Sequence, residues 1–222
     1  MVILLFGPPG CGKGTQSPLI SKMLQIPAIS TGEMLRAEVE AGTALGQEAQ
    51  AVLAAGQLVG DEIVNRMLVH RITQPDCRNG FLLDGYPRTL PQAEYLDGQL
   101  KELGFPQPTV FHLATPQSVL IERISSRRQC PQCGRIYNLL FKPPVRPGVC
   151  DADGTKLVRR SDDSVEVVRA RLLAYEKLTS PIMLHYAGGD YHSVSANRPP
   201  GEIFRDIEAV LRERRNGASA TR

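Results

Sequence analysis

Long apolar runs, strong net charge and aromatic residues are all scarce in this chain. Its 222 residues include no tryptophan, only 5% aromatic residues, and a net charge of just +3. No apolar stretch is long enough to form a membrane-spanning helix, and the near-balanced charge gives no reason to expect nucleic acid or a membrane surface as a partner. The apolar start, residues 1–6, is too short for a signal-peptide core and has no basic leader, so we expect a cytoplasmic protein.

Short apolar segments recur along the chain, at residues 2–6, 27–30, 81–84, 109–113 and 191–195. Helical stretches separate them, and this alternation is typical of a doubly wound α/β fold with a parallel sheet. Continuous apolar runs such as Phe81-Leu82-Leu83 suit strands that are buried on both faces. We therefore predict a five-stranded parallel sheet whose ligands lie beyond the carboxyl ends of its strands.

The first apolar segment runs directly into a glycine-rich turn, Gly-Pro-Pro-Gly-Cys-Gly-Lys-Gly-Thr, at residues 7–15. Glycines let backbone N–H groups approach phosphate oxygens closely, and a helix that begins there adds the positive end of its dipole. Lys13 supplies a charge that can reach the β- and γ-phosphates. The turn therefore predicts a polyphosphate site, although Gly14 stands where the general P-loop pattern has Ser or Thr.

Two segments look like insertions into the α/β pattern. Residues 30–59 contain two short helical stretches, 33–40 and 45–53, interrupted by Gly42 and Gly56. Residues 127–160 are rich in cysteine, proline and glycine, and the alternating sequence at 136–139 indicates a small β module. The tail from Arg212 onward is polar, and we expect it to be frayed.

The five cysteines are unevenly placed, and three of them fall in the β module. Cys130 and Cys133 form one knuckle, and Cys150 and Asp153 form a second of the same shape, each followed by glycine. Tetrahedral Zn²⁺ takes four such ligands, and none of its positions would then stay open for substrate. We predict a structural zinc site held by these four residues. Asp151 is the alternative fourth ligand.

Three motifs resemble the nucleoside monophosphate kinases, and the adenylate kinase family above all. Residues 7–16 fit Gly-x-Pro-Gly-x-Gly-Lys-Gly-Thr-Gln, and residues 81–89 fit an internal motif of the family, with Tyr86 where Phe is usual. Residues 160–163, with Glu166 and Arg171, are similar to the segment that follows the family's lid. The resemblance covers nearly the whole chain apart from the polar tail.

The resemblance implies a division of the chain and a reaction. It implies a core P-loop domain at 1–29, 60–126 and 161–222, an AMP-binding flap at 30–59, and a zinc-stapled lid at 127–160. It implies Mg²⁺-dependent phosphoryl transfer, ATP + AMP ⇌ 2 ADP, by a monomer whose partners are the small molecules ATP, AMP and ADP. Two closing flaps suit such chemistry, because water must be kept away from the donor phosphate.

The resemblance also implies an AMP site. Arg36 and Arg88 would clamp the α-phosphate, and Gln92 would read the adenine edge with its paired donor and acceptor. Thr31 would lie beside the adenine, although residues 30–33 also form a capping box, and the two roles are compatible. The residues implied for AMP are Thr31, Arg36, Gln57, Leu58, Val59, Gly85, Tyr86, Pro87, Arg88, Gln92, Arg160 and Arg171.

For ATP the resemblance implies contacts from the glycine-rich turn, the lid and the end of the last strand. Arg123 would flank the donor adenine, Arg127 would touch the phosphates, and backbone near Pro199 would meet the adenine. The residues implied for ATP are Gly10, Cys11, Gly12, Lys13, Gly14, Thr15, Arg123, Arg127, Ile136, Tyr137 and Pro199. The residues expected to be catalytic are Lys13, Asp84, Arg88, Arg123, Arg160 and Arg171. Of these, the resemblance implies that Arg160 and Arg171 act on the phosphoryl group in flight.

Three acidic residues near these motifs are candidates for Mg²⁺ binding or for helix capping. Asp84, at a predicted strand end, suits water-mediated binding of Mg²⁺, an ion that keeps most of its water shell. Asp162 and Asp163 could assist, or could cap the helix that follows, and capping is the favoured interpretation of Asp162.

Two other functions remain open at this stage. A sister kinase for UMP, CMP or another monophosphate would keep the same fold, and Gln92 and Thr31 argue for adenine instead. A regulatory or scaffolding protein with an inactive P-loop could use the zinc module to bind nucleic acid or a protein. The module has few aromatic residues besides Tyr137 and Phe141, which argues against that function.

Overall fold

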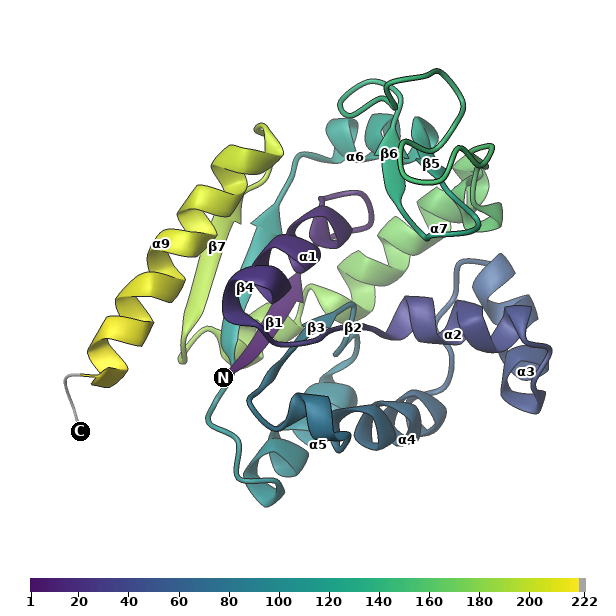
Figure 1. Cartoon of the computed structure of the whole chain (residues 1–222). Helices are drawn as coiled ribbons and strands as arrows, with labels where there is room; N and C mark the ends of the chain where they lie inside the picture. The colour runs from purple at the N-terminus through teal and green to yellow at the C-terminus, as the bar shows by residue number, and fades with distance from the viewer. Residues whose placement is uncertain (220–222) are drawn as a thin grey trace.

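The computed structural model describes residues 1–219, without the side chains of residue 161 and residues 215–219. Its centre is a five-stranded parallel sheet in the order β2-β3-β1-β4-β7 (Figure 1). The strands are β1 (Val2–Phe6), β2 (Ala28–Ser30), β3 (Phe81–Asp84), β4 (Thr109–Ala114) and β7 (Tyr191–Ser195). The predicted α/β fold and its five strands are thus confirmed, with bounds that differ from the predicted ones by one residue at two ends.

The central strand β1 shows why its sequence is apolar throughout. Val2, Leu4 and Phe6 pack into one hydrophobic cluster, whereas Ile3 and Leu5 pack into another on the opposite face of the sheet. Successive side chains of a strand point to opposite faces, so a strand covered on both faces has no polar side. Cross-sheet neighbours on both sides, Leu83 of β3 and Val110 of β4, continue the same pattern.

Helices cover both faces of this sheet. Helices α4 (Asp61–Ile72), α5 (Leu90–Glu102) and α8 (Ile182–Tyr186) contribute to the first cluster. Helices α1 (Lys13–Leu24), α6 (Gln117–Ser125), α7 (Val165–Ala174) and α9 (Pro200–Ser219) contribute to the second. Short turns η1 (Pro75–Cys77), η2 (Ser161–Asp163) and η3 (Tyr175–Thr179) connect some of them. No described helix is long and apolar enough to cross a membrane.

The two inserted segments lie away from the layers of the sheet (Figure 1). Helices α2 (Thr31–Glu40) and α3 (Ala44–Ala54) fill residues 30–59, close to the predicted helical stretches. Residues 127–160 contain the antiparallel pair β5 (Arg127–Gln129) and β6 (Ile136–Asn138). Their small core consists of Cys130, Tyr137, Cys150 and Leu157.

The tail from Arg212, which was expected to be frayed, is helical as far as Ser219, and residues 220–222 lie outside the described residues. Helix α9 continues through that polar stretch to Ser219, beyond its last buried residue, Leu211. Arg212 bonds to Glu208 one turn earlier, and Arg214 pairs with Asp190 at the start of the last strand, Nη2 to Oδ1 at 2.5 Å. Two ion pairs therefore support this helix beyond Leu211.

Candidate active site

A cavity of about 550 Å³ opens at the carboxyl ends of the central strands, where the glycine-rich turn meets segment 127–160. A second cavity of about 50 Å³ lies against segment 30–59 and shares Arg36, Arg88 and Arg171 with the larger one. Both cavities are therefore at the edge of the sheet where an α/β fold places its ligands.

The residues predicted to bind ATP line the larger cavity, and most of those predicted to bind AMP line the smaller one. All of those implied for ATP line the larger cavity, as does Asp84: Gly10, Cys11, Gly12, Lys13, Gly14, Thr15, Arg123, Arg127, Ile136, Tyr137 and Pro199. Of those implied for AMP, the smaller cavity is lined by Thr31, Arg36, Gln57, Leu58, Val59, Gly85, Arg88, Gln92 and Arg171. Pro87 and Arg160 line only the larger one.

Tyr86 lines neither cavity. Its side chain is only 1% exposed, and its hydroxyl donates to Asn65 Oδ1 at 2.6 Å and to the Gln92 carbonyl at 3.2 Å. The side chain therefore ties α4 to the start of α5, and only the backbone around it adjoins the site.

The glycine-rich turn has the conformation that its sequence predicts. Gly10 and Gly12 both have positive φ, 84° and 110°, and Gly12 immediately precedes α1. A Cβ on Gly10 would lie 2.7 Å from Ile124 Cγ1, so no larger residue fits there. Lys13 Nζ donates to the carbonyls of Gly7 and Pro8 at 2.6 and 3.2 Å, which places the ammonium group over the turn.

Guanidinium groups crowd the boundary between the two cavities. Burial and the neighbouring charge of Arg171 lower the pKa of Arg88 to about 10, and burial with the charge of Arg127 lowers the pKa of Arg160 to about 10. Within the described part of the chain, Arg36, Arg88 and Arg160 take part in no ion pair, and Arg160 Nη2 is buried without a hydrogen-bond partner. Such a cluster favours a polyanion, because phosphate oxygens would satisfy both the charge and the buried donor.

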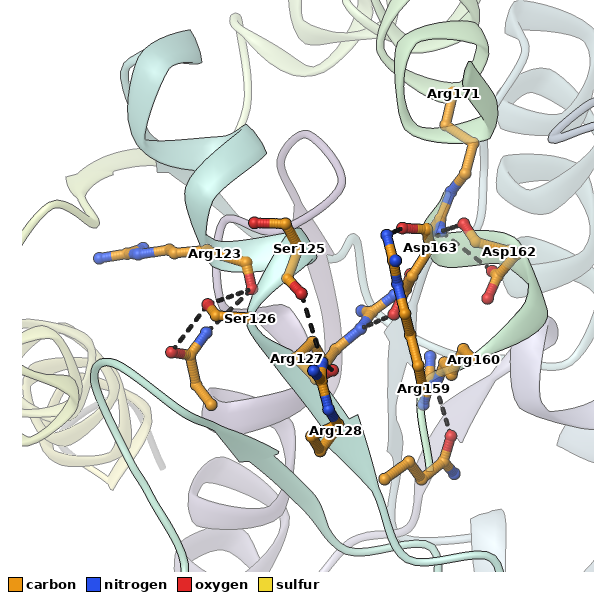
Figure 2. A network of polar contacts seen from close by, with 12 residues as sticks. Arg123, Ser125, Ser126, Arg127, Arg128, Arg159, Arg160, Asp162, Asp163 and Arg171 are labelled. Atoms are coloured by element: carbon orange, nitrogen blue, oxygen red, sulfur yellow. Dashed lines mark hydrogen bonds and ion pairs between the residues drawn. The ribbon is translucent and has the colours of Figure 1, made fainter. Parts of the chain in front are cut away.

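Two other arginines of the cluster are held by carboxylates (Figure 2). Arg127 Nε donates to Asp163 Oδ2 at 2.8 Å, and Arg171 Nη1 donates to Asp162 Oδ2 at 2.9 Å. Asp163 is fully buried, and its Oδ1 also lies 3.5 Å from Arg171 Nη1. The pair of aspartates thus holds guanidiniums from β5 and α7 at one place.

This arrangement corrects the interpretation of Asp162 as a helix cap. The N-cap of α7 is Ser164, whose hydroxyl accepts from Val167 N at 3.3 Å. Asp162 lies two residues earlier, in η2, and its carboxylate turns to Arg171 instead. Only Asp162 and Asp163 were considered as caps from the sequence, but Ser164, the next residue, has the extended backbone that the capping position requires.

Gln92 is buried at the floor of the smaller cavity, with 2% of its side chain exposed. Its Oε1 accepts from Arg88 N at 2.8 Å, and its Nε2 donates to Asp61 Oδ1 at 2.7 Å. Thr31 lies nearby, where its hydroxyl donates to the Gly85 carbonyl at 3.0 Å. Half of the predicted capping box is present: Ser30 Oγ accepts from Glu33 N, and the described contacts include no bond from Ser30 N to the Glu33 carboxylate.

Arg123 lines the larger cavity, and its side chain points away from Asp162 and Asp163 (Figure 2). Its Nη1 donates to the Ala196 carbonyl at 2.9 Å, and its guanidinium lies 5.6 Å from the centre of the Phe141 ring. Phe141 was not among the predicted site residues. Phe141 follows two other apolar residues, Leu139 and Leu140, so the sequence pattern does not indicate which of the three side chains lines the cavity.

Asp84 ends β3 beside the glycine-rich turn, as the sequence predicts. Its Oδ2 accepts from Ser17 Oγ at 3.3 Å, and it lines the larger cavity. A carboxylate at this position, with an oxygen not otherwise engaged by protein donors in the described contacts, is compatible with a hydrated Mg²⁺.

The four predicted metal ligands of segment 127–160 come together. One ligand atom from each of Cys130, Cys133, Cys150 and Asp153 lies within 4.8 Å of every other. The Cys133 and Cys150 sulfurs are 3.5 Å apart, close to the roughly 3.8 Å separation that tetrahedral bonds of 2.3 Å to Zn²⁺ imply. The rival ligand Asp151 is engaged elsewhere, because its Oδ1 accepts from Val145 N at 2.8 Å.

Comparisons with known proteins give a consistent result. A family model described as adenylate kinase matches residues 5–190. An adenylate kinase of Syntrophomonas wolfei is 47% identical over 212 residues, which cover 95% of this chain and 99% of that protein. Similar proteins named adenylate kinase come from Anaeromyxobacter dehalogenans, 48% identical over 95% of this chain and 99% of that protein, and Carboxydothermus hydrogenoformans, 46% identical over 96% of this chain and 100% of that protein.

Proposed function

This chain belongs to the adenylate kinase family and is a nucleoside monophosphate kinase that interconverts ATP + AMP and 2 ADP; we propose that ATP binds in its larger cavity and AMP in the smaller one. The observation that carries this placement is a cluster of three arginines: Arg36 and Arg88 line both cavities, and Arg160 lines the larger one. Among the side chains that the structure describes, none of the three takes part in an ion pair. Phosphoryl transfer needs little beyond positioning and neutralisation of charge, and the cluster is built for both.

In this proposal the glycine-rich turn and Lys13 hold the β- and γ-phosphates of ATP, and Arg123 with Pro199 flanks its adenine. Arg36 and Arg88 hold the α-phosphate of AMP, and Thr31 and Gln92 adjoin its base. Arg160 and Arg171 stabilise the charge that develops on the transferred group. No nucleophilic side chain is required, because the AMP phosphate itself attacks.

The proposal includes a division of labour along the chain. Residues 1–29, 60–126 and 161–219 form a rigid core, residues 30–59 close over AMP, and residues 127–160 close over ATP. Closure would exclude water, which would otherwise hydrolyse the donor. We also propose that the protein acts as a cytoplasmic monomer.

Two metal ions belong to the proposal. Asp84 would hold Mg²⁺ through water, and that ion neutralises charge on the ATP phosphates when bound. Cys130, Cys133, Cys150 and Asp153 would hold Zn²⁺, which fits the mutual approach of their ligand atoms. The role of this zinc would be structural, because four protein ligands leave no position for substrate.

The test is ADP formation from Mg·ATP with AMP, GMP, CMP, UMP or dTMP as acceptor. We expect turnover with AMP and little with the others. Lys13→Gln should abolish turnover, whereas Lys22→Gln, an exposed lysine of the same helix, should leave it intact. Turnover confined to a pyrimidine acceptor would move the chain to a sister activity. No turnover with any acceptor would contradict the proposed site.

A further inference from the structure

The carboxamide of Gln92 is held between two protein groups whose hydrogen-bonding sense is fixed. Asp61 Oδ1 accepts from Gln92 Nε2 at 2.7 Å, and Arg88 N donates to Gln92 Oε1 at 2.8 Å. An ionised carboxylate can only accept, and a backbone N–H can only donate. Turning the amide by 180° would set oxygen against oxygen and N–H against N–H. The orientation of this side chain therefore follows from the chemistry of its partners.

Asp61 is itself held rigidly. Its second oxygen, Oδ2, accepts from Thr89 Oγ1 at 2.7 Å, and the same hydroxyl caps α5 by accepting from Gln92 N at 3.3 Å. Asp61 is the first residue of α4, and Thr89 is the N-cap of α5. We call these hydrogen bonds of Asp61 with Thr89 and Gln92 the lock. The lock joins the starts of two packed helices, α4 and α5, and none of its side chains is a flexible surface group.

A carboxamide has two donors and two acceptor sites, and each of its two protein partners occupies one. In the described contacts, one N–H and one oxygen lone pair of Gln92 are therefore left for a ligand. Gln92 lines the smaller cavity with Thr31 and apolar side chains such as Leu35 and Val59. A base edge that presents an acceptor beside an amino group, as N1 and the 6-amino group of adenine do, matches this pair. The corresponding edge of guanine presents N1–H and a carbonyl, which is the reverse.

We propose that Asp61 determines base specificity by locking the Gln92 carboxamide in the orientation that pairs with an amino-bearing purine and rejects a keto-bearing one. Asp61 touches no nucleotide in this scheme, so it is a positioning residue that acts through Gln92. The inference rests on the proposed function, since it assumes that the acceptor base enters the smaller cavity with its phosphate at Arg88. A buried polar pair left facing the wrong partner is what makes such discrimination strong.

The decisive variant is Asp61→Asn, which keeps the size of the side chain but can both donate and accept. Gln92 then loses one of the two contacts that forbid the turned orientation. We expect the ratio of kcat/KM for AMP to that for GMP to fall about tenfold, the loss of one of two orienting contacts. The change should lie in KM for the monophosphate, and KM for ATP should stay unchanged. A general weakening of the fold would not produce this split.

The matched control is Glu62→Gln, which removes the same charge from the first turn of α4 at the exposed neighbouring position. It should leave the AMP-to-GMP ratio at the wild-type value. An unchanged ratio in Asp61→Asn, in a wild-type background that is active on AMP, would overturn this inference alone. A wild-type protein with no AMP turnover would overturn the proposed function, and this inference with it.

A second measurement is made on the wild-type protein. In uniformly ¹⁵N-labelled wild-type protein, the Gln92 side-chain amide should be protected from solvent exchange, because one of its N–H groups donates to Asp61 Oδ1. The resonances can be assigned by their loss in Gln92→Met. Exchange as rapid as that of an exposed glutamine side chain would show that the carboxamide is not held, and would overturn the lock.

Discussion

Asp163 and Arg127 form a two-point ion pair that fastens the start of segment 127–160 to the turn before α7. Arg127 Nε donates to Asp163 Oδ2 at 2.8 Å, and Nη2 of the same guanidinium donates to Oδ1. The carboxylate is fully buried, and the arginine side chain is 15% exposed. Arg127 also lines the larger cavity. The ion pair therefore fixes a positive charge at the cavity wall, and it does so by burying the Asp163 carboxylate.

Asp163→Asn should destabilise the protein strongly, by about 3–5 kcal/mol, because it leaves the Arg127 charge buried without its partner. Thermal unfolding of wild type and variant measures the effect. Glu208→Gln is the matched control, since it breaks the exposed pair between Glu208 and Arg212 one helical turn away on α9. That change should cost less than about 1 kcal/mol. Equal losses in the two variants would show that Asp163 contributes no more than a surface pair.

The neighbouring pair of Asp162 and Arg171 should make stability depend on pH. Burial acts to raise the pKa of Asp162, but the guanidiniums of Arg171 and Arg36 outweigh it and hold the pKa below its ordinary value. The unfolded chain therefore binds the proton more readily than the folded one. The contribution of Asp162 is fully present above the ordinary carboxyl pKa of about 3.9, and it is lost as pH falls through the lower folded value.

Melting temperatures of wild type and Asp162→Asn, measured from pH 7 down to pH 3, test this dependence. The gap between the two proteins should be widest at neutral pH and should narrow in the acid range, because the unfolded wild-type chain there binds a proton at Asp162 more readily than the folded one. A gap of constant width over the whole range would contradict the assigned origin of the pKa shift.

The sequence predicted those parts of the site whose chemistry is local. The glycine-rich turn follows a strand and opens a helix within fifteen residues, and three of its glycines, Gly7, Gly10 and Gly12, have positive φ. The metal ligands form two knuckles of four residues each, so spacing alone predicted their approach. Both features depend on short-range geometry that a residue pattern specifies.

Contacts between elements that are distant in the sequence could not be predicted from the residue pattern. Asp61 and Gln92 are 31 residues apart and meet only because α4 packs beside α5. The contact of Asp163 with Arg127 likewise crosses the whole of segment 127–160. Acidic residues at these positions look like ordinary helix-start residues, since Asp61 opens α4 and Asp163 precedes α7.

The metal site predicts a sharp difference between two nearby aspartates. Asp153→Ala should reduce the bound metal below the roughly one zinc per chain expected of wild type, and should lower the melting temperature. Asp151→Ala should keep the metal, because Asp151 bonds to the Val145 amide and lies outside the ligand cluster. Elemental analysis and melting curves, with and without chelator, measure both. Metal loss in Asp151→Ala with retention in Asp153→Ala would reverse the assignment of the fourth ligand.

Tyr137 links the ligand cluster to the larger cavity. Its side chain is 2% exposed, and its hydroxyl lies 3.4 Å from Cys150 Sγ while accepting from Asp151 N at 2.8 Å. Because the hydroxyl oxygen already accepts from that amide, its own proton is available for the Cys150 sulfur. Hydrogen bonds to a ligand sulfur hold it in place and stabilise its thiolate form.

Tyr137→Phe should therefore weaken zinc binding about 10- to 100-fold, the usual effect of losing an outer hydrogen bond to a metal ligand. Competition for zinc against a chromophoric chelator measures this affinity directly, without reference to turnover. Tyr95→Phe, which removes the hydroxyl of an exposed tyrosine on α5, should leave it unchanged. Equal zinc affinities of the two variants would show that the contact between Tyr137 and Cys150 is packing alone and does not stabilise the bound metal.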